Sequence, residues 1–486
     1  MARHRKAALL ILACALLALA ACSRERGSEE REASQPARPG APNVVVVMTD
    51  DQALDTMRAM PRTRRLLGRH GVTFETAVVS FPLCCPSRAT FLTGRYAHNH
   101  GVKDNHAPEG GIGKLDQEDT LPVWLERAGY RTAFVGKYLN GYGKPEHGGP
   151  EFVPPGWSEW YGLTAESKRD VYDYEINENG ELRRYGGSEE DFKTDVLARL
   201  ARDFVRRASG EEEPFFLWVA TPAPHADRAL EGAERNPEPA PRHRGRFEGL
   251  RAPRGPAFDE ADVSDKPAFV RELPRLGRKA QAKIDRAWVS QLESLLAVDE
   301  LVADLVRELR RRGELRRTLF IFTSDNGYLR GQHRIDRGKS KLYDESILVP
   351  LLVRGPRFPA GVRTRNPVVN VDLAATIVRL SGAQPDAPLD GVPLWRALRP
   401  EGRERAALVE VFARKADRFQ GLRTRRYAYA ERDHDVGELY DLRRDPHQLR
   451  SRFEDPAYAR ARAQLSRRLA QLRDCAGAAC WRTDAK

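Results

Sequence analysis

Short apolar runs that alternate with helical patterns constrain the fold of this chain more than any other feature. Five runs rich in β-branched and aromatic residues are typical of buried parallel strands. They are Val44–Met48, Thr132–Val135, Phe215–Ala220, Thr318–Thr323 and Pro350–Val353. Helical periodicity covers Thr120–Ala128, Asp191–Ala208 and Lys279–Arg312. This alternation predicts an α/β fold in which helices flank a large, mostly parallel central sheet.

Two regions depart from this pattern. Asp227–Arg278 is rich in Pro, Arg, Gly and Glu and has little periodicity, and a loop of that length is usually functional or disordered. After about Pro385, three short runs predict an antiparallel meander and a helix follows it; these segments are Ala407–Phe412, Gly421–Ala430, Glu438–Leu442 and Pro456–Arg473. We therefore expect a main domain over residues 43–385 and a smaller C-terminal subdomain over 386–486.

The N-terminus has the pattern of an export signal. Basic residues precede the apolar run Ala7–Ala21, which is too short to cross a bilayer comfortably. The run ends in Leu19-Ala20-Ala21-Cys22, which resembles a bacterial lipobox and makes Cys22 the lipidated residue. The alternative is an ordinary signal peptide with an incidental cysteine. Residues 1–21 are thus expected to be a signal peptide and 22–42 a disordered tether, which places the protein on the outer face of the bacterial membrane as a lipoprotein, or outside the cell as a secreted protein.

Charge and cysteine usage narrow the choice of partners. The net charge of +12 suits acidic ligands, but no basic run alternates with aromatics and no zinc-finger or helix-turn-helix spacing occurs, so we expect no nucleic acid partner. Membrane contact is expected only through the lipid anchor. Cys475 and Cys480 are predicted to form a short-loop disulfide in an oxidising compartment, with free thiols as the alternative. Adjacent cysteines such as Cys84 and Cys85 rarely bridge, so this pair calls for another explanation.

Acidic residues follow two of the predicted strands directly. Asp50 and Asp51 come after the first strand, and Asp325 and Asn326 come after the strand that ends near Ser324. Because ligands bind at the carboxyl ends of strands in open α/β sheets, these side chains predict a hard-cation site for Ca²⁺ or Mg²⁺. The alternative is that each group merely forms the turn that ends its strand.

The segment Leu83–Arg95 contains Cys84-x-Pro86-x-Arg88, followed by Thr93-Gly94-Arg95. This pattern resembles the signature of the type I sulfatases, which depend on formylglycine. In that family a maturation enzyme reads the Pro and the Arg and oxidises the first cysteine, here Cys84. The resemblance extends from about Asn43 into the C-terminal subdomain, and it implies an alkaline-phosphatase-like sulfatase fold. Several further segments look most like N-acetylglucosamine-6-sulfatases and their bacterial relatives; they are 97–100, 136–140, 223–225, 263–267, 324–328 and 439–442.

The resemblance assigns roles to individual residues. It makes Asp50, Asp51, the converted Cys84, Asp325 and Asn326 the ligands of a divalent metal, with Ca²⁺ favoured and Mg²⁺ as the alternative. It makes Arg88 the brace of the formylglycine and of the metal ligands. Lys137 and Lys339 match the two lysines that bind sulfate, and Lys339 is preferred to Lys341 because Tyr343 follows it by four residues. His225 matches the partner of a sulfate oxygen or the proton donor to the leaving alcohol.

The implied reaction is hydrolysis of a sulfate monoester on a sulfated sugar. In the family, a metal-bound gem-diol of formylglycine attacks sulfur, and the covalent sulfo-enzyme intermediate then collapses. One departure is Leu139, which stands where many sulfatases have a histidine, so the general base is unassigned. His98, His100 and His333 are candidates for the neighbourhood of the substrate or ordinary loop histidines.

Two other functions compete with this interpretation. One is a phosphodiester or phosphonate hydrolase of the same superfamily, and the other is a catalytically silent, carbohydrate-binding lipoprotein. The segment Asp227–Arg278 is the part of the chain that we expect to shape substrate selectivity.

Overall fold

The computed structural model describes residues 37–165, 167, 170–227, 235–399, 405–412 and 418–483. The expected signal peptide, Cys22 and most of the expected tether lie outside these residues. Residues 37–486 form one compact unit. Ala41 and Pro42, at the end of the expected tether, are buried, and the carbonyl of Pro42 accepts a hydrogen bond from the hydroxyl of Tyr130 at 2.9 Å. No helix among the described residues is both long and apolar enough to cross a membrane.

A ten-stranded mixed sheet, in the order β11-β2-β10-β9-β1-β8-β4-β5-β6-β7, forms the centre of this unit. Its middle strands are parallel; they are β9 (Thr318–Ser324), β1 (Asn43–Thr49), β8 (Phe215–Ala220), β4 (Arg131–Gly136) and β5 (Glu159–Leu163). Four of these are strands predicted from their apolar runs, and their residues are almost completely buried. The prediction of a large, mostly parallel central sheet flanked by helices is confirmed for this part of the molecule.

Toward its edges the sheet contains antiparallel pairs of strands, and here one prediction was wrong. Pro350–Val353 was expected to be parallel, but β10 (Leu351–Arg354) runs antiparallel to β9. The chain between β9 and β10 stays at the carboxyl edge of β9, and without a crossover to the opposite edge the next strand must reverse direction. The other edge strands, absent from the prediction, are β2 (Val72–Phe74), β11 (Val362–Thr364), β6 (Tyr174–Glu178) and β7 (Glu181–Tyr185).

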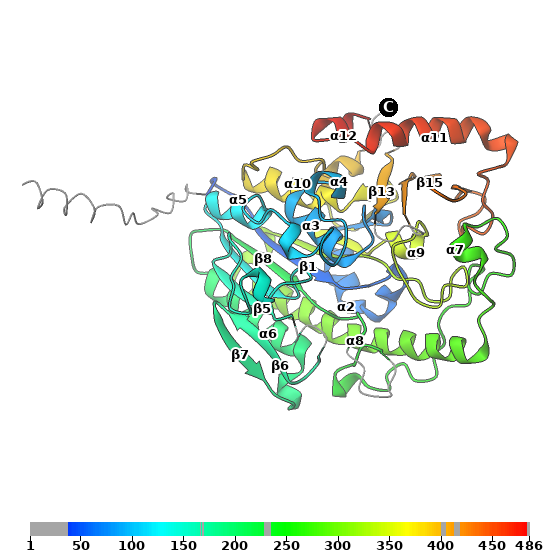
Figure 1. Ribbon diagram of the computed structural model, residues 1–486. Coiled ribbons are helices and arrows are strands. Elements are labelled where there is room, and N and C mark those ends of the chain that lie inside the picture. Colours follow the sequence, from blue (N-terminus) through cyan, green and yellow to red (C-terminus); the bar gives the residue numbers. More distant parts are fainter. Residues whose placement is uncertain are drawn as a thin grey trace, which may run out of the picture. The chain divides into compact units, whose positions relative to one another are not determined.

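Helices cover both faces of the sheet (Figure 1). On one face, α6 (Lys193–Ala208) and α8 (Arg278–Arg311) bury apolar side chains against Val45 and Val47 of β1. On the other face, α3 (Cys84–Thr93), α5 (Leu121–Arg127) and α10 (Val371–Ser381) pack against Val44 and Val46. Alternate residues of β1 thus face opposite layers, as the two-residue period of a strand requires. The short elements are α2 (Pro61–Thr63), α4 (Ala97–His100), α7 (Ala268–Arg271), α9 (Asp344–Ile347), β3 (Ala77–Val78) and β12 (Val368–Val369).

A second, four-stranded antiparallel sheet lies near the C-terminus, as expected. It consists of β13 (Ala407–Val411), β14 (Phe419–Arg423), β15 (Tyr427–Arg432) and β16 (Glu438–Asp441), and α11 (Ala459–Leu472) and α12 (Ala478–Thr483) follow it. The expectation of one strand over Gly421–Ala430 was wrong. A turn at residues 424–426 divides it, because the hydroxyl of Thr424 accepts hydrogen bonds from the backbone of Arg426 and Tyr427. No glycine or proline marks this turn in the sequence.

The aperiodic segment over residues 227–278 is ordered wherever the structure describes it. Arg242 pairs with Asp195 of α6 and with Glu300 of α8 at 2.6 and 2.7 Å. Farther along, the backbone amide of Ala252 donates to Asp285 of α8 at 2.9 Å. Ion pairs and backbone hydrogen bonds therefore fix this segment on α8, although its described residues, 227 and 235–277, contain no strand and only the short helix α7 and a turn of 3₁₀-helix at Pro241–His243.

Candidate active site

The carboxyl ends of β1 and β9 bring the acidic residues together. The two strands pair in register through Thr49 and Ser324, so the residues that follow them meet at one edge. The backbone amide of Asp51 donates to the carboxylate of Asp325 at 3.1 Å. The side-chain amide of Asn326 donates to Asp51 at 2.7 Å. The side chains of Asp50, Asp51, Asp325 and Asn326 are buried, and parallel pairing alone is enough to place them together.

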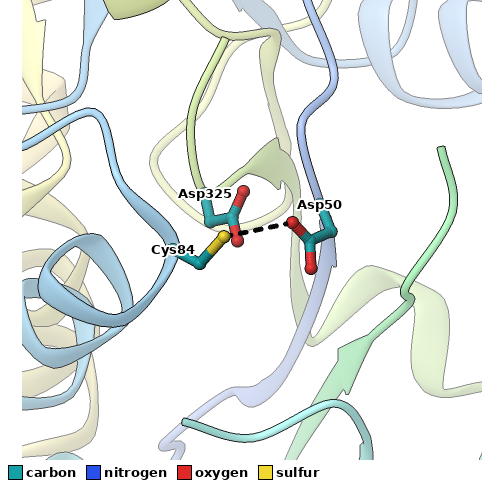
Figure 2. Close-up of side chains that lie close together, drawn as sticks. All are labelled: Asp50, Cys84 and Asp325. Atoms are coloured by element: carbon teal, nitrogen blue, oxygen red, sulfur yellow. Dashed lines mark hydrogen bonds between the residues drawn. The ribbon is translucent and has the colours of Figure 1, made fainter. Parts of the chain in front are cut away.

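Cys84 reaches the same point from the other layer. It is the first residue of α3, and its side chain is 2% exposed. Its Sγ lies 3.4 Å from a carboxylate oxygen of Asp50, and the side chain of Asp325 lies beside them (Figure 2). The ligand atoms of these three residues lie within 4.8 Å of one another. The N-terminal end of a helix carries a partial positive charge and therefore favours an anion. Because residue 84 is the first residue of α3, an anionic group beside it would be stabilised.

Arg88 fixes this arrangement from one turn farther along α3. Its guanidinium is fully buried and makes two contacts of 2.9 Å with Asp325, through Nε and Nη2. Nη2 also lies 3.4 Å from Asp50, and Nη1 donates to the carbonyl of Lys137. A planar group with several donors can hold two carboxylates and a carbonyl at once, which a lysine cannot do. Arg88 therefore braces the two strand ends against α3.

Two lysines and a histidine complete the cluster. Lys137 follows β4 and pairs with Asp50, while Lys339 comes from the loop after β9 and pairs with Asp51. The Nζ of Lys339 also lies 2.9 Å from Cys84 Sγ. Nε2 of His225, after β8, lies 3.7 Å from Asp51. Lys341 is elsewhere, with its ammonium over the ring of Phe269 at 4.3 Å.

Burial and neighbouring charges shift the pKa values of Asp50, Asp325 and Cys84 in this cluster. Burial raises the pKa of Asp50, but Lys137, His225, Arg88 and Lys339 outweigh it and hold that pKa well below its usual value. Burial and the charge of Asp50 raise the pKa of Asp325. Burial and the same charge raise the pKa of the Cys84 thiol to about 12. An unmodified Cys84 is therefore protonated at neutral pH and is a poor nucleophile.

The donor set fits a hard divalent cation. Carboxylate and amide oxygens are the ligands that Ca²⁺ and Mg²⁺ prefer, and the ammonium of Lys339 already lies among Asp51, Cys84 and Asn326. An added cation would also favour the ionised form of Asp325. The three aspartates and the three basic groups Arg88, Lys137 and Lys339 balance in charge. A divalent cation would therefore leave the cluster positive and suited to an anionic substrate.

Three histidines considered from the sequence have structural partners instead. The ring of His98 contacts Glu410 and the carbonyl of Cys475, both at 2.8 Å, and the two nitrogens of His100 contact Thr90 and the amide of Val102. His333 is fully buried, and its Nδ1 lies 2.7 Å from Glu260. None of these rings takes part in a contact with the aspartate cluster among the described residues. The general base therefore stays unassigned.

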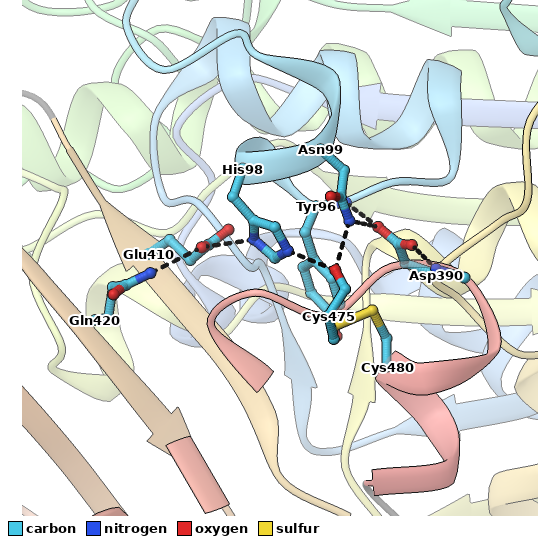
Figure 3. The surroundings of a disulfide bond; sticks show 9 residues. Tyr96, His98, Asn99, Asp390, Glu410, Gln420, Cys475 and Cys480 are labelled. Atoms are coloured by element: carbon cyan, nitrogen blue, oxygen red, sulfur yellow. Dashed lines mark hydrogen bonds and ion pairs between the residues drawn. A yellow bond between two sulfur atoms is a disulfide. The ribbon is translucent and has the colours of Figure 1, made fainter. Parts of the chain in front are cut away.

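The disulfide region lies against α4. Cys475 and Cys480 are bonded, and the carbonyl of Cys475 also accepts from the side chain of Asn99 at 2.8 Å (Figure 3). Asp390 accepts from Asn99 at 2.8 Å and from the amide of Gly477, inside the disulfide loop, at 2.6 Å. The segment Ala97–His100 thus serves as the docking point of the C-terminal loop.

Replacing His98 with asparagine is expected to destabilise the protein more at pH 6 than at pH 9. Burial lowers the pKa of His98, but the hydrogen bond to Glu410 and its charge, the hydrogen bond to the carbonyl of Cys475 and the charge of Asp390 together outweigh burial and raise that pKa above its usual value. A raised pKa in the folded state adds stability that is complete below the unfolded pKa and is lost as the pH rises through the folded value. Denaturant unfolding of both proteins at the two pH values measures the difference. An equal loss at both would contradict a charged His98.

One residue that supports the site was missed in the sequence. The side chain of Asn105 accepts a hydrogen bond at 2.8 Å from the backbone amide of Cys85, in the first turn of α3. It thereby satisfies an amide that the helix leaves without a partner. Asn105 lies 20 residues away in the chain, and no local capping pattern precedes Cys84, so the sequence offers no signal for it.

An α/β sheet with buried carboxylates, basic groups and a cysteine at its carboxyl edge defines a hydrolase-like site for an anionic group. Comparison with known proteins agrees with this class. Residues 42–383 match the family described as Sulfatase, and residues 331–475 match the description "N-sulphoglucosamine sulphohydrolase, C-terminal". The chain belongs to the sulfatase family.

Individual relatives carry related names. Human N-acetylglucosamine-6-sulfatase is 40% identical over 370 residues, which cover 74% of this chain and 64% of that protein. The N-acetylglucosamine-6-O-sulfatase of Bacteroides thetaiotaomicron is 27% identical and covers 94% and 89%. A structure described as bound to its substrate D-glucosamine-2-N,6-O-disulfate aligns with a TM-score of 0.71 and 24% identity, and covers 88% and 97%. The chain spans about three fifths of the length of the mammalian relatives, and the solved structure confirms the alkaline-phosphatase-like fold.

Proposed function

We propose that this protein is an exported sulfatase that hydrolyses sulfate monoesters of sugars, with 6-sulfated N-acetylglucosamine as the model substrate. The sequence relatives that carry this name support the choice of sugar. The observation that carries the proposal is the position of Cys84, whose sulfur lies 3.4 Å from Asp50 and 2.9 Å from Lys339. A side chain that reacts with an anionic sulfate ester must lie beside cationic groups, because these groups neutralise the charge of the ester.

The basic groups of the cluster would bind the sulfate. In sulfuryl transfer, as in phosphoryl transfer, positioning and neutralisation of charge supply most of the rate. Lys137 and Lys339 are paired with Asp50 and Asp51, so their ammonium groups are held in place before the substrate arrives. His225 is partly exposed at 24% and is the group that can give a proton to the leaving alcohol.

Oxidation of Cys84 to formylglycine explains what a thiol cannot do here. The thiol is protonated at neutral pH, because burial and the charge of Asp50 raise its pKa. Hydrated formylglycine supplies one hydroxyl that can attack sulfur and a second that allows sulfate to leave, whereas a serine has only the first. The conversion requires a maturation enzyme that recognises Cys84, Pro86 and Arg88.

A divalent metal, Ca²⁺ by preference, would be held by Asp50, Asp51, Asp325, Asn326 and position 84. When bound, it neutralises charge on a sulfate oxygen and acidifies a hydroxyl at position 84. Arg88 then has the task of keeping Asp50 and Asp325 oriented, since Asp325 accepts a hydrogen bond from its guanidinium and Asp50 forms an ion pair with it. Export with lipidation of Cys22, or secretion, would bring the protein to extracellular glycans and keep Cys475–Cys480 oxidised.

A substrate panel tests the proposed function. Purified full-length protein is assayed on N-acetylglucosamine 6-sulfate, on 4-nitrophenyl sulfate and on the matching phosphate monoester, phosphate diester and phosphonate monoester. We expect higher kcat/KM for both sulfates than for any phosphorus ester. Preference for the phosphonate or the phosphate diester would assign the site to the other hydrolase class, and inactivity on all five would favour a silent binding protein.

Removal of the metal is expected to abolish turnover and to lower the thermal midpoint. An ion that binds only the folded protein stabilises it by mass action, so loss of the ion lowers the stability of the fold as well as the rate of the reaction. The measurement is turnover and thermal unfolding after dialysis against a chelator, then after adding Ca²⁺ or Mg²⁺. Full turnover in the chelated protein would contradict the metal site.

A further inference from the structure

A groove lies outside the catalytic cluster, on the β10–β2–β11 side of the sheet. It has a volume of about 810 Å³, within the usual range for ligand sites. One wall consists of the turns and short helices between Leu54 and Arg69, including α2. The opposite wall and the floor come from β10, β2 and the start of β11, with Leu351 and Leu352 among the lining residues.

The groove is strongly basic. Four arginines line it, namely Arg64, Arg65, Arg69 and Arg363, against the single carboxylate of Glu75. Glu75 is already shared between Arg363 and Arg365. Among the described residues, the exposed side chains of Arg64, Arg65 and Arg69 make no hydrogen bond or ion pair. Three guanidinium groups on one wall are therefore free to bind an anion.

Further positive charge lies behind this wall. Arg354 of β10 donates to the carbonyl of Leu66 at 2.9 Å. Burial and, second to it, the charge of Arg310 lower the pKa of Arg354.

The groove leads away from the active site. Its upper end is formed by Leu54, three residues after Asp51, and by Leu351, which pairs with Thr323 two residues before Asp325. Gly361 lines it beside the edge strand β11, where Val362 pairs with Val72, and the register places this pair level with Ile321 in the middle of β9. A ligand lying along it would extend from near the catalytic edge toward β11.

We propose that this groove binds a sulfated polysaccharide chain and thereby recruits polymeric substrate. The proposal rests on the proposed function and extends it from a single sulfated sugar to a polyanionic chain. Guanidinium groups bind sulfate through two parallel hydrogen bonds, and an apolar floor suits the carbon faces of sugar rings. A bilayer surface is flat and would contact protruding side chains, so a groove with an apolar floor favours a chain over anionic headgroups.

The triple variant Arg64→Ala/Arg65→Ala/Arg69→Ala tests this inference. The probe is a heparin octasaccharide, and its Kd for the full-length protein is measured at several salt concentrations. We expect the Kd to rise about tenfold or more at low salt and the salt dependence to become weaker. Turnover of 4-nitrophenyl sulfate should not change, because these arginines do not contact the catalytic cluster. The control is Arg184→Ala/Arg460→Ala/Arg467→Ala, which removes the same charge from exposed positions elsewhere and should leave the Kd unchanged.

Three outcomes would overturn the inference. One is an unchanged Kd in the groove variant, and another is an equal rise in the control variant, which would reveal only a general charge effect. The third is loss of binding to phosphatidylglycerol vesicles with unchanged octasaccharide binding, which would assign the groove to a membrane. If the protein binds the octasaccharide through these arginines but hydrolyses no sulfate ester, the proposed function fails while the groove assignment stands.

Discussion

Replacing Cys84 with alanine is expected to lower turnover of sulfate esters by about 10⁴-fold or more, the scale seen when a nucleophile is removed. The protein should stay folded, since the side chain is small and α3 retains Arg88 and the cap from Asn105. Cys84→Ser is expected to be equally inactive in turnover, because a serine lacks the second hydroxyl. The measurement is kcat/KM on 4-nitrophenyl sulfate together with a circular dichroism spectrum.

The adjacent cysteine provides a matched control. Cys85 is also buried, but it belongs to the apolar core cluster that contains Phe91 and Leu92, whereas Cys84 is the cysteine grouped with Asp50 and Asp325. Cys85→Ala should therefore keep most of the turnover and cost about 1 kcal/mol of stability through the small cavity that it leaves. Equal activity of the two alanine variants would contradict a catalytic role for position 84.

Replacing Arg88 with methionine is expected to lower the free energy of unfolding by about 3–5 kcal/mol, the usual cost of leaving buried charges without a partner. Asp50 and Asp325 would lose their common guanidinium, and both side chains are fully buried. Turnover should also collapse, because the two carboxylates would no longer be held in position. Arg88→Lys should recover part of the stability and little of the activity, since one ammonium cannot make the same contacts. Denaturant unfolding at fixed Ca²⁺ concentration and kcat/KM are measured on each variant.

Arg405 separates stability from catalysis. It pairs with the fully buried Asp372 of α10, away from the catalytic cluster. Arg405→Met is expected to destabilise the fold while leaving kcat/KM of the remaining folded protein near the wild-type value. An Arg88→Met protein that is as active as Arg405→Met would show that Arg88 does not position the site.

The core of the fold could be predicted because buried strands have a strong signature. The run over Val44–Met48 is apolar at every position, as a strand covered on both faces must be. The direction of β10 could not be predicted, because it depends on whether the preceding loop crosses the sheet and not on the residues of the strand. The edge strand β7 was missed for a related reason: four of its five residues are exposed and three are charged, so no apolar run marks it.

The candidate active site could likewise be predicted only in part from the sequence. The aspartates could be placed because they follow predicted strands directly, and parallel pairing brings strand ends to one edge. Their contact with Cys84 could not be derived from the strands, because the position of α3 depends on packing across the sheet. Lys339 and His225 lie on loops, whose path the sequence pattern does not describe, and they entered the prediction only through the family resemblance. Neither the strand pattern nor the family resemblance pointed to Asn105, so this residue was missed.

The central claim is that position 84 of the active protein is an oxidised side chain within the aspartate cluster. A peptide mass spectrum of a preparation that hydrolyses sulfate esters tests this claim most directly. The account predicts a peptide spanning residue 84 that is about 18 mass units lighter than its unmodified sequence, because the thiol has become an aldehyde. An intact thiol at Cys84 throughout a fully active preparation would contradict it.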